Sequence, residues 1–369
     1  MPKIRVLVVD DAVVIRKILT EVLSSDEEIE VVGTAANGKI ALQKIPQTNP
    51  DIVTLDVEMP ELSGLDTIPL IRKDYPRLPI IMFSTLTERG GAATLEALSR
   101  GATDYVTKPA NVGSVTNAKE AVRDELIGKI KSLAERRAFR PPPSASPAKI
   151  QPPVIKRPAI SASPAVKIVV IGVSTGGPNA LAKVIPALPG DFPAPILIVQ
   201  HMPPMFTRLL ADRLNDQAAL TVVEATQSTK IEPGKVYIAP GDYHMEITGV
   251  LSDPRTKLHQ GPPENSCRPA VDVLFRSAAA LYGSAILAVV LTGMGQDGLL
   301  GSRYISEAGG RIIVQDQATS VVWGMPGYVA EAGLAEAVLP LESVAGEIIR
   351  RATGNFRPKC AAPGREGLA

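Results

Sequence analysis

A proline-rich segment in the middle of the chain divides it into two halves that have to fold separately. Residues 140–166 repeat proline among serine and alanine and offer little that could pack into a core. Proline removes the backbone N–H donor and fixes φ, so neither a helix nor an interior strand continues through such a segment. We therefore expect a semi-extended linker over 140–166, with one domain before it and one after it.

The composition is that of an ordinary globular protein. The 369 residues carry a net charge of +1 and 45% hydrophobic side chains, which gives no bulk electrostatic reason to expect nucleic-acid or membrane binding. No segment approaches the roughly 18–20 apolar residues of a membrane span. The apolar run 4–9 is too short for a signal peptide, and the two cysteines rule out a disulfide framework, so we expect a cytoplasmic protein.

In the first half, short apolar runs alternate with helical patterns, which predicts a doubly wound, flavodoxin-like α/β domain over residues 1–125. Its last helix is expected to continue to about 139. Ligands should gather at the carboxyl ends of the parallel strands. The expected strands are 4–10, 30–34, 52–56, 79–84 and 104–107, and the expected helices are 13–24, 38–44, 64–73, 92–100 and 117–138.

The second half alternates in the same way and predicts a second α/β domain, with a mostly parallel sheet, over residues 167–355. A hairpin of 245–250 with 257–260 is expected in addition, and 356–369 is expected to be a disordered tail. The expected strands are 167–171, 196–200, 236–239, 285–291 and 311–314, and the expected helices are 178–185, 205–214, 271–282, 298–307 and 343–352.

Five polar side chains follow the expected strands of the first half and should meet at one edge of the sheet. Clustered carboxylates repel one another unless a cation is present, and a site made only of oxygen ligands suits Mg²⁺. The cation and a lysine would neutralise a phosphoryl group on a carboxylate, and a serine could bond to it. Helix capping explains any one of these residues but not all of them together: Asp10, Asp11, Asp56, Ser84 and Lys108.

The first half resembles the receiver domain of bacterial response regulators over its whole length. The resemblance rests on Val-Val-Asp-Asp at 8–11, Leu-Asp-Val-Glu-Met-Pro at 55–60, Ser-Thr at 84–85 and Tyr-Val-Thr-Lys-Pro at 105–109. It implies that a histidine kinase supplies a phosphoryl group to Asp56. It implies that Tyr105 changes rotamer on activation, with Ser84 in place of the commoner threonine. The implied Mg²⁺ ligands are Asp11, Asp56 and the backbone carbonyl of Glu58, with Asp10 near by.

In the second half, Ser174 stands in a glycine-rich turn between an apolar run and a helical pattern, as Gly172-Val-Ser-Thr-Gly176. Such a turn exposes the hydroxyl at the carboxyl end of a strand, beside the free N–H groups of a helix start, which suit an oxyanion. The pattern predicts a serine hydrolase. A phosphate-binding turn, or a tight turn without chemistry, is the alternative.

A serine nucleophile needs a base and a group that orients the base. Of the 3 histidines, His201 directly follows the strand 196–200 and is the preferred base; His244 and His259 are expected to be structural. Asp297 follows the strand 285–291 and is placed to accept a hydrogen bond from His201, although it could simply cap the next helix. The rival acids are Asp242, Asp272 and Asp316.

The second half is similar to the catalytic domain of the CheB family of protein-glutamate methylesterases and glutamine deamidases, over about 167–352. The motifs are GVSTGGP at 172–178, QHMP at 200–203, YIAPGDYH at 237–244, RPAVDVLF at 268–275, LTGMGQDG at 291–298 and MP at 325–326. The resemblance implies Ser174 as nucleophile, His201 as base and Asp297 as orienting acid. Thr175 and Met294 match positions that line the site, and their backbone N–H groups are candidate oxyanion donors.

The implied reaction is hydrolysis of glutamate methyl esters, and deamidation of selected glutamines, on chemoreceptor helices, with no cofactor for the hydrolysis. We expect the receiver to pack over the Ser174 edge and phosphorylation to favour an open arrangement. Three other readings are a transcriptional regulator, which would need a basic recognition surface, a dinucleotide-binding oxidoreductase, whose glycine pattern is missing, and an inactive scaffold.

Overall fold

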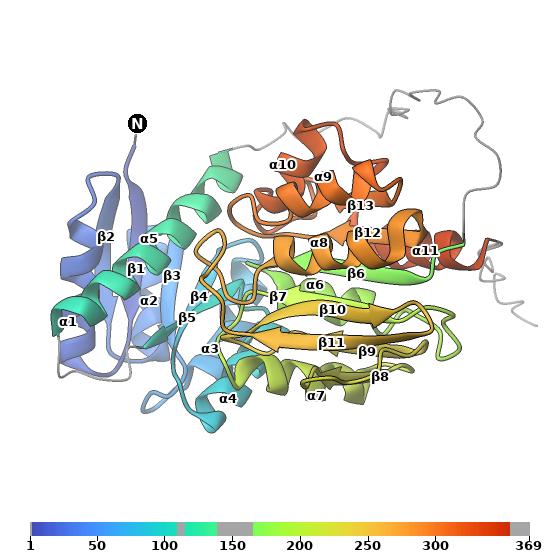
Figure 1. Cartoon of the computed structure of the whole chain (residues 1–369). Coiled ribbons are helices and arrows are strands. Elements are labelled where there is room, and N and C mark those ends of the chain that lie inside the picture. The colour runs from blue at the N-terminus through green and yellow to red at the C-terminus, as the bar shows by residue number, and fades with distance from the viewer. Residues whose placement is uncertain (1, 109–114, 139–164, 355–369) are drawn as a thin grey trace, which may run out of the picture.

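A computed structural model describes residues 2–108, 115–138 and 165–354, and it shows two α/β lobes side by side (Figure 1). Nearly all of the expected linker, and the whole of the expected tail, lie outside these residues. None of the helices within the described ranges is long and apolar enough to cross a membrane.

The first lobe is a five-stranded parallel sheet in the order β2-β1-β3-β4-β5, as expected for a doubly wound domain. Alternate residues of β1 face opposite sides, because successive side chains in a strand do. Leu7 and Val9 pack toward α2, α3 and α4, whereas Val6 and Val8 pack toward α1 and α5. The elements are β1 (Ile4–Val9), α1 (Val13–Ser24), β2 (Ile29–Ala35), α2 (Gly38–Thr48), β3 (Ile52–Asp56), α3 (Gly64–Asp74), β4 (Ile80–Thr85), α4 (Glu88–Ser99), β5 (Asp104–Lys108) and α5 (Val115–Ala138).

The second lobe is a seven-stranded parallel sheet in the order β14-β13-β12-β6-β7-β9-β8, with a separate antiparallel hairpin of β10 and β11. The strands are β6 (Ile168–Val173), β7 (Ile196–Gln200), β8 (Thr221–Glu224), β9 (Lys235–Ile238), β10 (His244–Val250), β11 (Asp253–His259), β12 (Ile286–Val290), β13 (Arg311–Gln315) and β14 (Ala337–Leu339). The helices are α6 (Gly177–Val184), α7 (Phe206–Gln217), α8 (Val271–Tyr282), the short η2 (Gly283–Ala285), α9 (Leu299–Glu307), α10 (Met325–Glu331) and α11 (Leu341–Thr353).

The central strands of the second lobe are apolar on both faces because helices cover both. On β6, Val169 and Ile171 pack with α6, α7 and α11, while Ile168 and Val170 pack with α8, α9 and α10. This two-sided burial explains the nearly continuous apolar runs that mark these strands in the sequence.

Several elements differ from the sequence-based expectation. Strands β8 and β14 and helix α10 were not expected; they have only 4, 3 and 7 residues, too few for a periodic pattern. Helix α4 begins four residues before its expected start, because the Thr87 side chain accepts a hydrogen bond from Gly90 N–H and caps it. Helix α2 continues past its expected end through Pro46 and stops at Asn49, which has a φ of 41°.

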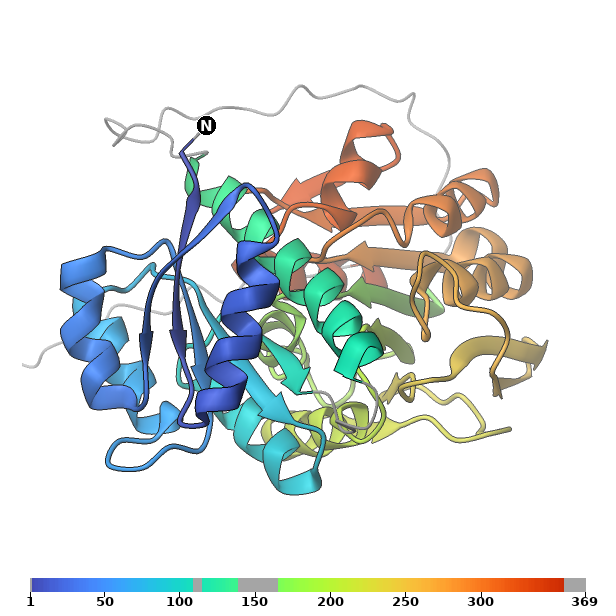
Figure 2. The same cartoon turned by 90° about the vertical axis from the view of Figure 1, so that its left-hand side faces the viewer.

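The two lobes meet where α4, β5 and α5 of the first face α6, α7 and the loops after β12 and β13 of the second (Figure 2). The rings of Tyr105 and Phe206 stack with centroids 5.1 Å apart. The side chain of Asn179 donates to the Ala102 carbonyl at 3.2 Å, and that of Arg213 donates to the Leu95 carbonyl. One continuous hydrophobic cluster therefore runs from the first lobe into the second.

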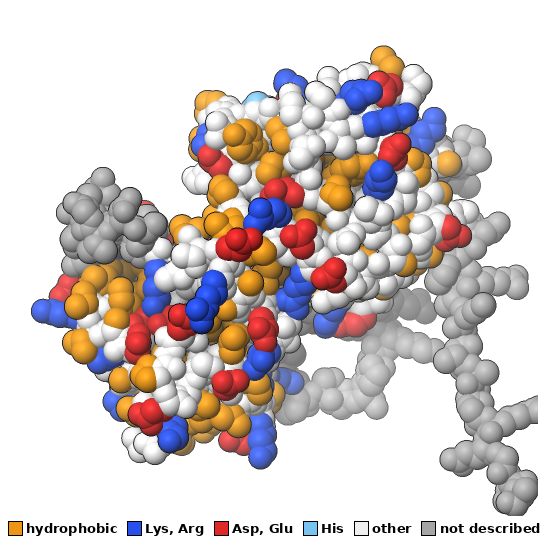
Figure 3. All heavy atoms as spheres, turned by 90° about the horizontal axis from the view of Figure 1, so that it is seen from below, with side chains coloured by type: hydrophobic (Ala, Val, Ile, Leu, Met, Phe, Trp, Pro, Cys, Tyr) orange, Lys and Arg blue, Asp and Glu red, His pale blue; other side chains and the backbone are white. Residues whose placement is uncertain are grey.

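Acidic and basic side chains are interspersed on one face of the molecule (Figure 3). On the face in Figure 3, Lys and Arg lie beside Asp and Glu, with no broad area of one sign. This pattern agrees with the net charge of +1 and offers no basic surface for nucleic acid on that face.

Candidate active site

Three carboxylates meet at the carboxyl edge of the first sheet, as expected. One oxygen from each of Asp10, Asp11 and Asp56 lies within 4.8 Å of the others. Lys108 Nζ lies 2.9 Å from Asp10 Oδ2 and 2.8 Å from Asp56 Oδ2. Burial raises the pKa of Asp56 to about 6; the hydrogen bond from Lys108 opposes this, and the charge of Asp10 adds to it. Lys108 thus pairs with two of the three acids, and the three carboxylates together are an oxygen donor set that fits a hard divalent cation.

Of the three expected switch residues, Lys108 contacts the carboxylates, whereas Ser84 and Tyr105 have other partners. Ser84 Oγ donates to the Gly90 carbonyl of α4 at 3.1 Å, and Tyr105 is buried against Phe206 of the second lobe. The Lys129 ammonium lies 5.0 Å from the centre of the Tyr105 ring and donates to the Tyr105 carbonyl at 2.6 Å. The aromatic that the receiver resemblance assigns to switching is therefore part of the contact between the lobes.

The serine turn has the geometry expected of a nucleophile at a strand end. Ser174 directly follows β6, between β12 on one side and β7 on the other. Its N–H donates to the Thr292 carbonyl at 3.0 Å, and its own carbonyl accepts from Gly177 N–H at 2.8 Å and from the Gln200 side chain at 3.0 Å. Gly176 adopts a φ of 76°, which favours glycine and lets the chain turn sharply into α6.

Two backbone N–H groups beside Ser174 have no acceptor among the described residues. Among the hydrogen bonds of the described ranges, neither Thr175 N–H nor Met294 N–H donates to a protein acceptor. The Thr175 carbonyl accepts from Thr292 Oγ1 at 2.9 Å, and this contact ties the serine turn to the loop that carries Met294. Gly293 packs directly against Ser174: a Cβ there would lie 2.8 Å from Ser174 Cβ. Free N–H groups held in this way suit an oxyanion.

The expected contact between base and acid is confirmed. His201 directly follows β7, and its Nε2 lies 2.8 Å from Asp297 Oδ2. A carboxylate only accepts, so Nε2 carries the proton and Nδ1 is left to receive another. In this structure Nδ1 faces Cys267 Sγ at 3.5 Å, and no hydrogen bond within the described residues joins it to Ser174 Oγ.

These contacts shift the pKa values of the pair in opposite directions. Burial alone would lower the pKa of His201, but the hydrogen bonds to Asp297 and Cys267 outweigh it and raise the pKa to about 10. Burial alone would raise the pKa of Asp297, but His201 and the N–H groups of Val271 and Asp272 lower it. The pair therefore favours an imidazolium beside a carboxylate, the charge state reached when the base has taken a proton.

The rival acids and histidines have other partners. Asp272 accepts from Gly298 N–H and Gly301 N–H at the start of α9, Asp242 pairs with Arg268, and Asp316 accepts from Thr319. His244 bonds through both ring nitrogens, to the Pro262 carbonyl and to Ala270 N–H, while His259 accepts from Gly261 N–H. None of these residues contacts His201 among the described interactions.

Sequence reasoning missed two residues that touch the pair. Asn265 donates to Asp297 Oδ1 at 3.0 Å, and Cys267 contacts the His201 ring. Both lie just before the Arg-Pro motif at 268–269, in a turn where Asn265 and Ser266 have positive φ. The sequence has Asn-Ser at 265–266 between prolines at 263 and 269, a pattern typical of a turn. The pattern does not indicate which residues the turn contacts.

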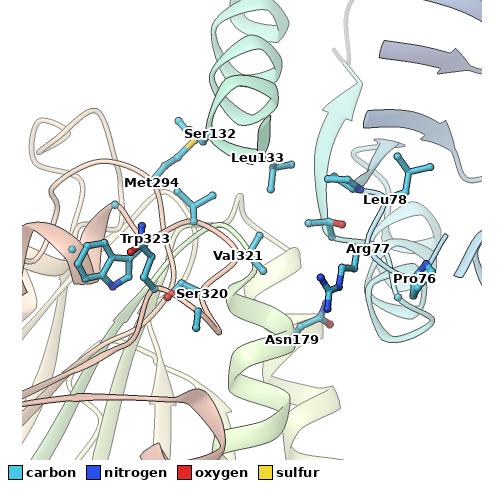
Figure 4. A pocket seen from close by; sticks show the side chains of 18 of the residues that line it. Pro76, Arg77, Leu78, Ser132, Leu133, Asn179, Met294, Ser320, Val321 and Trp323 are labelled. Atoms are coloured by element: carbon cyan, nitrogen blue, oxygen red, sulfur yellow. The ribbon is translucent and has the colours of Figure 1, made fainter. Parts of the chain in front are cut away.

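A cavity of about 1950 Å³ lies between the lobes (Figure 4). The first lobe lines it with Arg72, Leu78 and Leu133, and the second with Met294 and Trp323. Neither Ser174 nor His201 lines this cavity. The cavity is therefore a space between the two lobes, lined in part by Met294, and not the hydrolytic centre.

Comparison with known proteins gives the same division of the chain. The family model of the response regulator receiver domain matches residues 6–120, and that of the CheB methylesterase matches residues 169–348. A protein-glutamate methylesterase/protein-glutamine glutaminase of Nocardioides sp. is 57% identical, over 95% of this chain and 96% of the relative. A protein of the same name from Trichodesmium erythraeum is 53% identical, over 95% of this chain and 99% of the relative. A crystal structure of the Thermotoga maritima CheB methylesterase catalytic domain is 47% identical and covers 50% of this chain and 98% of its own, with a TM-score of 0.49.

Proposed function

The chain belongs to the CheB methylesterase family, and we propose that Ser174, His201 and Asp297 perform its hydrolytic chemistry. It is a protein-glutamate methylesterase and protein-glutamine glutaminase in which a receiver domain precedes the catalytic domain. The observation that carries the proposal is the 2.8 Å contact between His201 Nε2 and Asp297 Oδ2, at the sheet edge where Ser174 lies beside two unused N–H groups.

In the proposed reaction, His201 Nδ1 takes the Ser174 proton while Oγ attacks the carbonyl of a glutamate methyl ester. The N–H groups of Thr175 and Met294 hold the oxyanion of the tetrahedral intermediate, and Asp297 stabilises the imidazolium. His201 returns the proton to the departing methanol, and water then releases glutamate and frees Ser174. Glutamine deamidation follows the same steps, with ammonia leaving. Each event adds a negative charge to a receptor helix, and no cofactor takes part in the hydrolysis.

The receiver, which we assign to residues 1–125 with its last helix continuing to about 139, would accept a phosphoryl group on Asp56 from a chemotaxis histidine kinase. Mg²⁺ would lie on the carboxylates of Asp10, Asp11 and Asp56 and the carbonyl of Glu58, where it would neutralise phosphoryl oxygens. Lys108 would pair with the phosphoryl group, and Ser84 would turn from the Gly90 carbonyl toward it. We assign the catalytic domain to 167–355 and place the protein in the cytoplasm with the signalling helices of its chemoreceptor substrates.

The contact between the lobes supports an inhibitory receiver. Met294 and Val321 pack against the apolar cluster under α5, and Val321 also lies against Gly176 of the serine turn. Receptor helices would have to reach Ser174 past this covering. We infer that phosphorylation of Asp56 shifts the population toward an arrangement in which the receiver has moved away.

The test is methanol release from methylated receptor membranes, with wild type and Ser174→Ala, each with and without acetyl phosphate and Mg²⁺. We expect release that depends on Ser174 and rises with the phosphodonor. Ser174→Ala should lose turnover by a factor on the order of 10³ or more, while Asp56 is phosphorylated as in wild type. If Ser174→Ala released methanol at the wild-type rate, Ser174 would not be the nucleophile. If the wild-type protein released no methanol under any condition, the proposed function would be wrong.

A further inference from the structure

Two buried carboxylates meet beside the catalytic base. Asp272 and Asp297 are 3% and 2% exposed and lie at the starts of α8 and α9. Each accepts from the other's helix: Asp297 Oδ1 accepts from Asp272 N–H at 3.0 Å, and Asp272 Oδ1 accepts from Gly298 N–H at 3.0 Å. Burial and the charge of Asp297 raise the pKa of Asp272. Two carboxylates this close repel unless donors lie between them.

The side-chain amide of Asn265 supplies such a donor. Its nitrogen lies 2.9 Å from Asp272 Oδ2 and 3.0 Å from Asp297 Oδ1, so its two N–H bonds reach both acids. An amide donates twice without adding a charge, whereas a lysine or arginine here would compete with His201 for Asp297. The contact occupies Oδ1 of Asp297 and leaves Oδ2 for Nε2 of His201.

The turn that carries Asn265 is held independently of this amide. Glu264 and Cys267 exchange backbone hydrogen bonds at 3.1 and 2.8 Å, with Asn265 and Ser266 between them at φ of 51° and 61°. The Glu264 carboxylate accepts two hydrogen bonds, at 2.6 and 2.8 Å, from the guanidinium of Arg276 on α8. Asn265 as a whole is exposed, yet its side-chain nitrogen reaches both buried acids.

We propose that Asn265 is a positioning residue for the hydrolytic centre: its amide bridges Asp272 and Asp297 and holds the Asp297 carboxylate in the orientation that directs the His201 ring. This inference rests on the proposed role of Asp297. The titratable groups that face the pair are Cys267 at the His201 ring and Asp272 and Glu264 around Asp297. Without the amide, the Asp297 carboxylate loses a hydrogen-bond donor that stabilises its negative charge. It should then attract the imidazolium more strongly, so His201 should hold its proton to higher pH.

The test compares three variants of the full chain with wild type. Asn265→Gly removes the amide but tolerates the positive φ, Asn265→Asp keeps the shape and replaces the donor with a third carboxylate, and Ser266→Gly is the matched control on the same turn. Ser266 has a positive φ as well, and its side chain makes no hydrogen bond among the described contacts. Methanol release with acetyl phosphate and Mg²⁺ is measured from pH 6 to 11 against a blank without enzyme, and thermal unfolding checks that each variant is folded.

We expect kcat for Asn265→Gly to fall about ten-fold with KM unchanged, since a hydrogen bond to a charged group is lost. The midpoint of the rising limb of kcat/KM should move to higher pH. Asn265→Asp should lose more activity and shift further, while Ser266→Gly should match wild type. A wild-type profile for Asn265→Gly, or a uniform loss with an unmoved midpoint, would overturn the inference.

A second measurement does not depend on turnover. The chain has 3 histidines, so the His201 ring signal can be assigned by comparison with His201→Gln and followed by NMR as pH is raised. In Asn265→Gly this signal should titrate at higher pH than in wild type and Ser266→Gly. An unmoved His201 signal would overturn the positioning role of Asn265, whatever the methylesterase assay shows. Failure of the methylesterase assay for both wild type and Ser266→Gly would count against the proposed function instead.

Discussion

At the scale of single residues, the His201 ring is held on both nitrogens, by Asp297 on one side and Cys267 on the other. In the proposed reaction Nδ1 takes the Ser174 proton, so Cys267 lies at the nitrogen that the serine hydroxyl would have to approach. The thiol is therefore a competitor of Ser174 for the base. It also adds to the raised pKa of His201.

Replacement of Cys267 by Ala should consequently lower the pKa of His201. The base acts only in its neutral form, so activity rises as pH passes through that pKa; a lower pKa moves the rising limb toward acid and raises activity at pH 7. The measurement is the pH profile of kcat/KM for Cys267→Ala beside Cys267→Ser, which keeps a smaller donor and acceptor. A shift of the limb toward alkaline pH would contradict the expectation and would mean that the thiol donates to neutral Nδ1.

Much of the candidate site could be predicted from the sequence because strand ends in a parallel sheet share one edge. Ser174 and His201 follow adjacent strands, and the carboxyl side of β12 leads to Asp297, so their approach needed only the strand assignments. Asn265 and Cys267 could not be placed in this way. Their contacts depend on a turn with two positive φ values and on the Glu264–Arg276 pair, which have no periodic signal.

At the scale of elements, α8 and α9 begin at the same point and cap one another. Asp297, just before α9, accepts from the first two N–H groups of α8, and Asp272, in the first turn of α8, accepts from Gly298 and Gly301 N–H of α9. The same carboxylate thus caps α8 and contacts the His201 ring. From the sequence, Asp297 could simply cap the helix after Gly298; in the structure it caps the start of α8 instead, and the same carboxylate contacts His201.

Asp272→Ala should therefore destabilise the catalytic domain by about 2 kcal/mol, because Gly301 N–H and the Asn265 amide lose this acceptor, whereas Gly298 N–H keeps Asp297. Asp272→Asn, which keeps one acceptor oxygen, should cost about half as much. The free energy of unfolding is measured from the denaturant transition of this domain in the full chain, with Asp191→Ala as the control, since Asp191 is exposed and makes no described contact. Equal stability of Asp272→Ala and the control would show that the mutual capping contributes little.

The order of helices and long strands could be read from apolar periodicity, which is why both sheets were predicted as parallel α/β layers. The edge strands β8 and β14 were not predicted, because each pairs on one side only and needs few apolar residues. Helix α10 was missed because its 7 residues begin at Met325-Pro326 and give less than two full helical turns. These elements were missed because they are short, and not because their composition is unusual.

At the scale of the whole molecule, the receiver and catalytic domains share a hydrophobic cluster that includes Tyr105 and Phe206. Polar contacts surround it: Asn179 to the Ala102 carbonyl, Arg213 to the Leu95 carbonyl, and Arg208 to Glu88. Most of these contacts involve α4, the helix whose first turn accepts the Ser84 hydroxyl. A change at Ser84 on phosphorylation would thus act on the element that holds the domains together.

If the receiver limits access to Ser174, methanol release without phosphodonor should rise when the contact between the two domains is weakened. Arg213→Ala removes a charged donor to a backbone carbonyl, worth roughly 1–2 kcal/mol, so the open population and the methanol release without phosphodonor should rise about five-fold or more. Release with saturating acetyl phosphate should stay near the wild-type value, because in the proposed mechanism phosphorylation already favours the open arrangement. Arg350→Ala is the matched control: this exposed arginine of α11 pairs with Glu347 and contacts no described residue of the receiver. Basal release that stays at the wild-type level in Arg213→Ala would mean that the domain contact does not limit access to Ser174.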